Sequence, residues 1–428
     1  MEGKSLTLRK KGMKRSKVCV ENLKGVDTLL AHQILLLLLI GYIVYTIDIK
    51  KNYFPVPVVL VLIGIGLSFL PFFSNLHITK DIIFTVFLPA ILFTSAYQFP
   101  IKQLKENAGI IAALSTLGLM ATAGLLGLGI YWMSGLSISI SLTAAFLLAA
   151  ILIPTDPVSI TAILKQSKGE EKIADVVEGE SMVNDGTSVV IFTIFLAMFQ
   201  TEDGFSAGKF ISEFLVVSLG GIAVGLFLGW LMSKIIHYTH NRHYHVMLTI
   251  IVAYGGFYLA EAIGVSGVLA TVVAGIVLTF EFDEDKDNSH IQESLDGFWN
   301  IVNPTLLGLL FLLIGIQGAE YLAFSKWGLA VGIFLLSIFA RFIVLAVFIY
   351  GVPAWRKEFT NDFSTTSLLT WSGIKGAMSV ALLLWLENEV GEKDDLLVSL
   401  AFAVILLSLV IQSIGVYPLT KFINKQDK

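Results

Sequence analysis

The chain has few charged residues and a single cysteine. Only 14% of its residues are Asp, Glu, Lys or Arg, whereas soluble domains carry about 25%. The shortage of charge excludes an ordinary soluble domain, and the lone Cys19 excludes a disulfide within the chain. What remains is apolar, with 55% hydrophobic residues and a mean hydropathy of +0.80. The composition therefore predicts a membrane protein.

Apolar segments of membrane-spanning length recur along the whole chain. A spanning helix needs about 20 apolar residues, and thirteen segments approach or exceed that length. They are 29–47, 54–73, 81–98, 109–133, 137–164, 175–199, 209–233, 245–262, 264–280, 298–317, 323–351, 365–386 and 394–417. We therefore predict an all-α polytopic membrane protein with about 13 transmembrane helices. The transmembrane domain covers 29–417, between a basic N-terminal tail (1–28) and a short C-terminal tail (418–428).

Lys and Arg in the loops predict the orientation, because cytoplasmic loops collect them. Fifteen basic residues fall on the side that carries the C-terminus and four on the other side, apart from eight in the N-terminal tail. The tail alone favours the reverse orientation. The loops agree with one another along the whole length, so we expect a multi-pass protein of the plasma membrane with a cytoplasmic C-terminus.

Two neighbouring predicted spans contain carboxylates together with other polar side chains in their interior. The span 175–199 includes Glu180, Ser181, Asn184 and Asp185, and the preceding span includes Thr155-Asp156 between Pro154 and Pro157. An ionisable residue at the bilayer centre costs about 2.5–3.5 kcal/mol on insertion scales and usually marks an ion or proton pathway. Prolines break helices, and non-helical backbone at membrane depth is tolerated where it lines a cavity or is buried in protein. These residues predict a cation site with oxygen ligands at a broken helix.

Helical geometry separates the acidic residues of the span 175–199. Glu180 and Asn184 are four residues apart and share a face, whereas Asp185 lies about 100° further round the helix. Asp185 can therefore face a cavity while Glu180 faces a structural partner. Arg341 is a buried cation in another apolar span and needs an acidic partner. We expect Glu180 to be that partner.

The second half of the chain contains a possible counterpart of the broken helix. Gly373, Lys375 and Gly376 interrupt the apolar span 365–386. Paired interrupted helices in two halves of a transporter are typical of inverted repeats. Lys375 beside the helix ends can neutralise their C-terminal dipoles.

Several motifs in fixed order carry a family resemblance. They are Phe87-Leu88-Pro89-Ala90, Thr155-Asp156-Pro157, Glu178-Gly179-Glu180-Ser181, Asn184-Asp185-Gly186, Gly264-Val265-Ser266-Gly267-Val268-Leu269-Ala270 and Leu309-Leu310-Phe311-Leu312-Leu313-Ile314-Gly315. Over nearly all of 30–417 the chain resembles the cation:proton antiporter-1 family of sodium/proton exchangers, of the bacterial or archaeal type.

The resemblance implies an architecture and roles for particular residues. The family fold has thirteen helices in two inverted six-helix repeats, two crossing interrupted helices, and a homodimeric assembly. Carried over to this chain, Asp185 and Asp156 are the carboxylates that bind the transported Na⁺ or the proton, with Thr155 and Ser181 as further oxygen donors. The supporting residues are Asn184, the Glu180–Arg341 pair and Lys375. The family usually has arginine where Lys375 stands, and lysine lacks the planar guanidinium fork.

The function implied is secondary active transport and not enzymatic catalysis. A monovalent cation (Na⁺, and also Li⁺) would be exchanged for H⁺ by alternating access, without a cofactor or nucleic acid and within membrane lipid. Because Asn184 stands where electrogenic relatives have a second aspartate, the resemblance favours electroneutral one-for-one exchange. The nearer alternative is a K⁺/H⁺ antiporter of the same fold; a cation channel is more distant. An intramembrane hydrolase needs a nucleophile with a base, and Ser181 has no histidine in its segment.

Overall fold

The computed structural model describes most of the predicted transmembrane domain. The described residues are 29–48, 55–73, 76, 78–135, 140–156, 164, 171–201, 206–236, 242–284, 289–323, 325–359, 362–390 and 395–416. Both predicted tails, Cys19 and Pro157 lie outside these ranges.

Every regular element within the described ranges is a helix. After a first helix, Leu29–Asp48, the chain forms α2 (Val56–Ser68), α3 (Lys80–Ile82), η1 (Ile83–Phe87), α4 (Leu88–Gln98), α5 (Ile101–Ala113), η2 (Leu114–Gly118), α6 (Leu119–Ser134), α7 (Leu142–Leu152), α9 (Glu171–Gln200), α10 (Ala207–Ile236), α11 (Arg242–Ala262), α12 (Gly267–Glu284), α13 (Ser289–Gly318), η4 (Ala319–Leu322), α14 (Trp327–Gly351), α15 (Pro353–Glu358), α16 (Asp362–Trp371), α17 (Ala377–Val390), α18 (Asp395–Leu407) and η6 (Ser408–Gln412).

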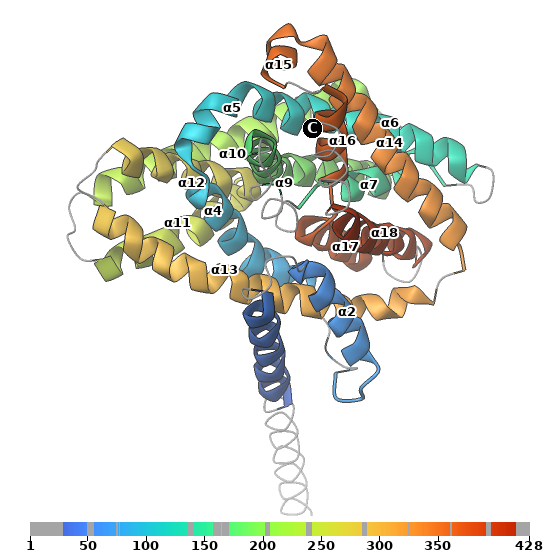
Figure 1. Ribbon diagram of the computed structural model, residues 1–428, viewed down its shortest axis with the longest axis horizontal. Helices are drawn as coiled ribbons and strands as arrows, with labels where there is room; N and C mark the ends of the chain where they lie inside the picture. Colours follow the sequence, from blue (N-terminus) through green and yellow to red (C-terminus); the bar gives the residue numbers. More distant parts are fainter. Residues whose placement is uncertain are drawn as a thin grey trace, which may run out of the picture.

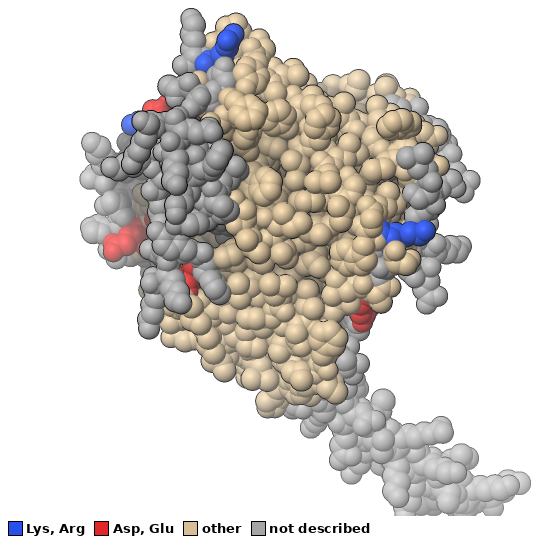
Figure 2. Space-filling model, turned by 45° about the vertical axis from the view of Figure 1, so that its right-hand side comes forward, with Lys and Arg blue, Asp and Glu red and all other residues tan. Residues whose placement is uncertain are grey.

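The helices have the length and surface that a bilayer requires. In the described part of the chain, nine helices are long and apolar enough to cross a membrane, and three shorter apolar helices accompany them. Large hydrophobic side chains face outward, including Trp132 at 82% and Phe69 at 80% exposure. Few charged residues interrupt the described surface in Figure 2. The predicted all-α polytopic membrane fold is confirmed.

Several helices begin earlier than the apolar spans. The predicted span 109–133 belongs to a longer helix, Ile101–Ser134, and α13 begins at Ser289 where the predicted span begins at 298. The extra turns contain polar residues such as Lys102 and Glu106. A hydropathy pattern detects only the apolar part of a helix, so these turns were missed.

The helices form two groups that lie beside each other (Figure 1). In what we call the scaffold group, α2 packs on α13, and α12 packs on α4, α10 and α11. In the site group, α7 packs on α6 and α9, and α14 packs on α6, α16 and α18. The helix α17 packs on α18 and α7, and so belongs to the site group. This arrangement leaves an interface in which α4 and α13 face α9 and α17.

Candidate ion-binding site

Two interrupted helices of the site group meet at their breaks. The first follows α7, where Pro154, Thr155 and Asp156 are not helical, and the second separates α16 from α17. The backbone N–H of Asp156 donates to the carbonyl of Ile374 at 2.8 Å. The hydroxyl of Ser379 donates to the carbonyl of Pro154 at 3.4 Å. The two predicted breaks therefore lie against each other; beyond Asp156, most of the first span lies outside the described residues.

The carboxylate of Asp156 lies at the N-terminal end of α17. The backbone N–H of Ala377, the first residue of α17, donates to Asp156 Oδ2 at 3.4 Å. Helix N-termini carry partial positive charge and stabilise anions. Gly376 makes this contact possible, because a Cβ atom there would lie 2.1 Å from Asp156 Oδ2 and 2.2 Å from its Cβ. Sequence and local structure thus fix one site carboxylate against a helix end.

The helix α9 carries the other predicted residues against the first break. Asn184 Nδ2 donates to Thr155 Oγ1 at 2.8 Å, and Ser181 Oγ lies 3.0 Å from the same oxygen. Ser181 also donates to the backbone carbonyl of Thr155. All three side chains are buried. Ser181 and Asn184 therefore hold Thr155 in place, which secures the non-helical segment next to Asp156.

A cavity of about 160 Å³ contains the two aspartates. It lies between the groups, with Asp156, Asp185 and Thr155 in the wall formed by the site group. The remaining lining residues are Ile91, Leu92, Ser95, Gln98, Pro154, Glu178, Asn303, Leu307, Gly376, Ala377, Met378 and Ser379. Asp156 and Asp185 interact electrostatically and both side chains are partly exposed. Two carboxylates and a hydroxyl supply the oxygen ligands that a hard cation prefers.

The structure brings Glu180 and Arg341 together, away from this cavity. Arg341 Nη1 and Nη2 donate to Glu180 Oε1 and Oε2 at 2.9 and 2.8 Å, and both side chains are buried. Arg341 Nε also donates to the carbonyl of Leu369 at 3.2 Å. Leu369 is in the last turn of α16, where carbonyls lack intrahelical partners. The pair predicted from the sequence thus joins α9, α14 and the end of α16.

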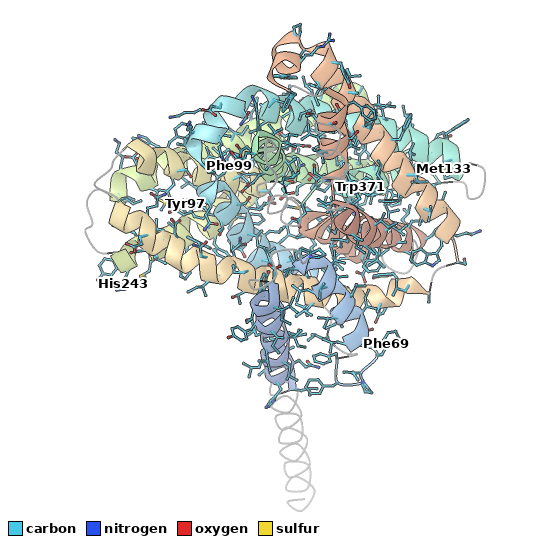
Figure 3. The ribbon with its side chains drawn as sticks, in the orientation of Figure 1. Phe69, Tyr97, Phe99, Met133, His243 and Trp371 are labelled. Carbon is cyan, nitrogen blue, oxygen red and sulfur yellow. The ribbon has the colours of Figure 1, made fainter. Side chains whose placement is uncertain are left out.

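Lys375 lies next to this ion pair, in the break between α16 and α17. Its side chain is 5% exposed and interacts electrostatically with Arg341 and Glu180. Its backbone N–H donates to Ser408 Oγ at 2.9 Å. The break begins after Trp371, labelled in Figure 3, whose indole donates to the carbonyl of Gln412 at 2.8 Å. Lys375 is therefore beside the end of α16, as the sequence predicts, and the break is fastened to the last spanning helix.

The scaffold side of the cavity was not predicted. Gln98, at the exposed end of α4, donates to Asn300 Oδ1 at 3.0 Å and marks where the cavity reaches the surface. Asn303 lines the wall nearby. Neutral amides in the polar end of a span carry no distinctive sequence signal.

The sequence of this chain is similar to that of a known family and of several of its members. The transmembrane region of the sodium/hydrogen exchanger family matches residues 34–422. The Na⁺/H⁺ antiporter NhaG of Bacillus atrophaeus is 33% identical over 391 residues, covering 89% of this chain and 72% of that protein. The Na⁺/H⁺ antiporter NhaP of Pseudomonas aeruginosa is 30% identical over 347 residues, covering 80% and 81%.

A solved structure shows the same fold. The sodium proton antiporter MjNhaP1 from Methanocaldococcus jannaschii at pH 8 superposes with a TM-score of 0.74 at 20% sequence identity, covering 91% of this chain and 97% of that chain. The likeness extends over nearly the whole described structure, and the family match extends over nearly the whole sequence. The chain belongs to the sodium/hydrogen exchanger family.

Proposed function

We propose that this protein exchanges Na⁺ for H⁺ across a membrane by alternating access. The observation that carries the proposal is the cavity at the crossing of two interrupted helices, with Asp156 and Asp185 in one wall. Interrupted helices near the midplane form ion sites in many secondary transporters. Relatives that are about 30% identical bear the name Na⁺/H⁺ antiporter.

In the proposed mechanism, a cation and a proton compete for the same carboxylate. Asp185 binds either one, and Asp156 and Thr155 supply further oxygens when a cation is bound. Asn184 supports the site through its hydrogen bond to Thr155. The role of Ser181 as a direct ligand stays a prediction, since its hydroxyl bonds to Thr155 in this conformation. The Glu180–Arg341 pair and Lys375 stabilise the helix ends behind the site.

Movement of the site group against the scaffold group would expose the cavity to each side in turn. The cavity reaches the surface at Gln98, close in the chain to Lys102 and Lys105 in the first turns of α5. Basic loops favour the cytoplasm, so we assign this opening and the C-terminus to the cytoplasmic side of the plasma membrane. We further propose a homodimer, transport of Li⁺ as well as Na⁺, and electroneutral one-for-one exchange by residues 29–417.

The proposal is tested by cation-induced collapse of a pH gradient in proteoliposomes. Na⁺, Li⁺ and K⁺ are added in turn with the membrane potential clamped at zero, for wild type and Asp185→Asn. Glu106→Gln provides the control, because it makes the same carboxylate-to-amide change on an exposed position of α5. Collapse by Na⁺ and Li⁺ that survives in Glu106→Gln and vanishes in folded Asp185→Asn is the expected result.

Other outcomes would select a different function. Collapse by K⁺ alone would keep the mechanism and change the substrate to K⁺. Cation flux without proton movement would identify a channel. Full exchange by Asp185→Asn would refute the assigned site while leaving the antiporter activity in place.

A further inference from the structure

One continuous helix runs along the interface between the two groups. It comprises Lys80–Gln98, and its Gln98 end marks where the ion cavity reaches the surface. At about 1.5 Å per residue, its Lys80 end lies about 27 Å away. The groups touch there through a set of polar and aromatic contacts that the ion site does not use.

The first contact joins Lys80 of the scaffold group to Glu389 of α17. Lys80 Nζ lies 3.3 Å from Glu389 Oε1 and 4.0 Å from the ring centroid of Trp385, also in α17. Trp385 Nε1 donates to Glu389 Oε1 at 3.2 Å. The ring of Trp385 in turn meets Phe84 of the scaffold edge to face, with centroids 4.8 Å apart. Lys80 is therefore held by the carboxylate of Glu389 and the ring of Trp385, both from α17.

The second contact joins α13 to α17 nearby. Gln317 Nε2 donates to Glu387 Oε2 at 3.2 Å. The amide is fixed from the other side, because Gln317 Oε1 accepts from the backbone N–H of Ile78 at 3.0 Å. Gln317 is 7% exposed. Two carboxylates near the C-terminal end of α17 are thus bound by separate elements of the scaffold group.

The helix α17 links these contacts to the ion site. Its first residue, Ala377, donates to Asp156, whereas Glu389 lies twelve residues later, about 18 Å along a helix. A displacement of the site group that opens the interface near Glu389 must separate Lys80 from Glu389 and Gln317 from Glu387. Partly exposed ion pairs contribute little stability. A contact that forms and breaks in every transport cycle has to be weak in this way.

We propose that the Lys80–Glu389 and Gln317–Glu387 contacts form a latch that closes the far end of the interface while the cavity is open near Gln98. The latch must break once in each exchange cycle, so these residues control transport without touching the ion. The inference rests on the proposed exchange by alternating access.

The test is to tie the latch shut and measure exchange. Cys19, the single cysteine, is replaced by Ser, and Lys80→Cys and Glu389→Cys are introduced together. A short bis-methanethiosulfonate reagent bridges the two thiols, because side chains as long as Lys and Glu hold their backbones too far apart for a direct disulfide. Na⁺-dependent proton movement is measured in proteoliposomes before bridging, after bridging and after reduction with dithiothreitol.

A matched control separates locking from damage. Gln200 Nε2 donates to the other oxygen of Glu389, Oε2, at 3.0 Å, and Gln200 is the last residue of α9, within the site group. The pair Gln200→Cys and Glu389→Cys can therefore be bridged in the same way without joining the two groups. We expect bridging to reduce the rate of exchange at least tenfold in the Lys80/Glu389 variant and to leave the Gln200/Glu389 variant active.

Each outcome bears on the latch separately from the exchange activity. Exchange before bridging and after reduction shows that the variant is folded and that the antiporter assignment holds. Exchange that continues in fully bridged Lys80/Glu389 protein would overturn the latch. Equal inhibition in the control pair would also overturn it, since loss would then come from modifying Glu389. A lack of exchange in unmodified wild type would instead refute the proposed function.

Discussion

Asp156 and Ile374 join the two helix breaks through their backbones: the N–H of Asp156 donates to the carbonyl of Ile374 at 2.8 Å. This bond fixes the main chain of Asp156 and does not depend on a side-chain rotamer. The same carboxylate accepts from the N–H of Ala377. The proposed ion site is therefore built into the junction of the two helix breaks, and changes in that junction should change transport.

Gly376→Ala should disable exchange with the ion-binding residues intact. The added Cβ would lie 2.1–2.2 Å from Asp156 atoms, so the two breaks must separate. Overpacking of this kind costs about 1–3 kcal/mol, and we expect at least a tenfold loss of Na⁺-dependent proton movement. Gly66→Ala is the control, because nothing lies within 4 Å of its Cβ position. Normal exchange by Gly376→Ala would mean that the breaks do not need this close approach.

Glu180→Gln should destabilise the fold more than a surface substitution does. It leaves the buried guanidinium of Arg341 without its bidentate partner and close to Lys375. Removing one partner of a buried pair costs about 3–5 kcal/mol. The measurement is the midpoint of thermal unfolding in detergent. Arg341→Lys should lower the midpoint less, since it keeps the charge but loses the fork; equal midpoints for wild type and Glu180→Gln would exclude a structural role for the pair.

The sequence predicted the parts of the site that depend on unusual residues inside apolar spans. Carboxylates, prolines and paired glycines are costly there, so Asp156, Asp185 and Gly376 were identified without coordinates. The Glu180–Arg341 pair followed from helix periodicity and the cost of an unpaired buried charge. The π-helical turns Ile83–Phe87, Leu114–Gly118 and Ser408–Gln412 were not predicted, because nothing in their sequences separates them from the α-helical turns beside them.

The contacts between the scaffold group and the site group could not be predicted from the sequence either. Lys80, Gln317 and Glu389 lie at the ends of spans, where polar residues are expected for solvation alone. Only the packing of α17 against the scaffold group brings Glu389 to Lys80. Long-range pairing of this kind depends on how whole helices are arranged, and a single sequence contains no direct signal for it.

Competition between H⁺ and Na⁺ predicts how the Michaelis constant depends on pH. If both ions bind the Asp185 carboxylate, protonation removes the cation site without altering the steps that follow cation binding. The KM for Na⁺ should therefore rise as the pH falls, approaching about tenfold per pH unit when most sites are protonated. The maximal rate at saturating Na⁺ should change much less. Initial rates in proteoliposomes over a matrix of pH and Na⁺ concentration give both quantities; a KM that does not vary with pH would contradict a shared site.

Glu389→Gln should alter exchange without altering the shape of its pH profile. Partial burial alone would raise the pKa of Glu389, but hydrogen bonds from Lys80, Trp385 and Gln200 and the charge of Lys80 lower that pKa overall. With a lowered pKa, the charged pair is fully formed above the ordinary glutamate pKa of about 4.3 and is lost only as the pH falls through the lowered value.

The pair therefore stays formed over the whole range in which exchange is measured, about pH 6 to 9. Losing it weakens closure of the interface near Lys80, so the cavity should be open near Gln98 for less of the time. The KM for Na⁺ presented on the Gln98 side should rise by at most about fivefold, the limit for a partly exposed ion pair, and by the same factor at every pH. A change in KM that appeared only at one end of the pH range would instead mean that Glu389 titrates during transport. In that case the contact with Lys80 would act as a pH sensor, and its role would not be that of a fixed closure.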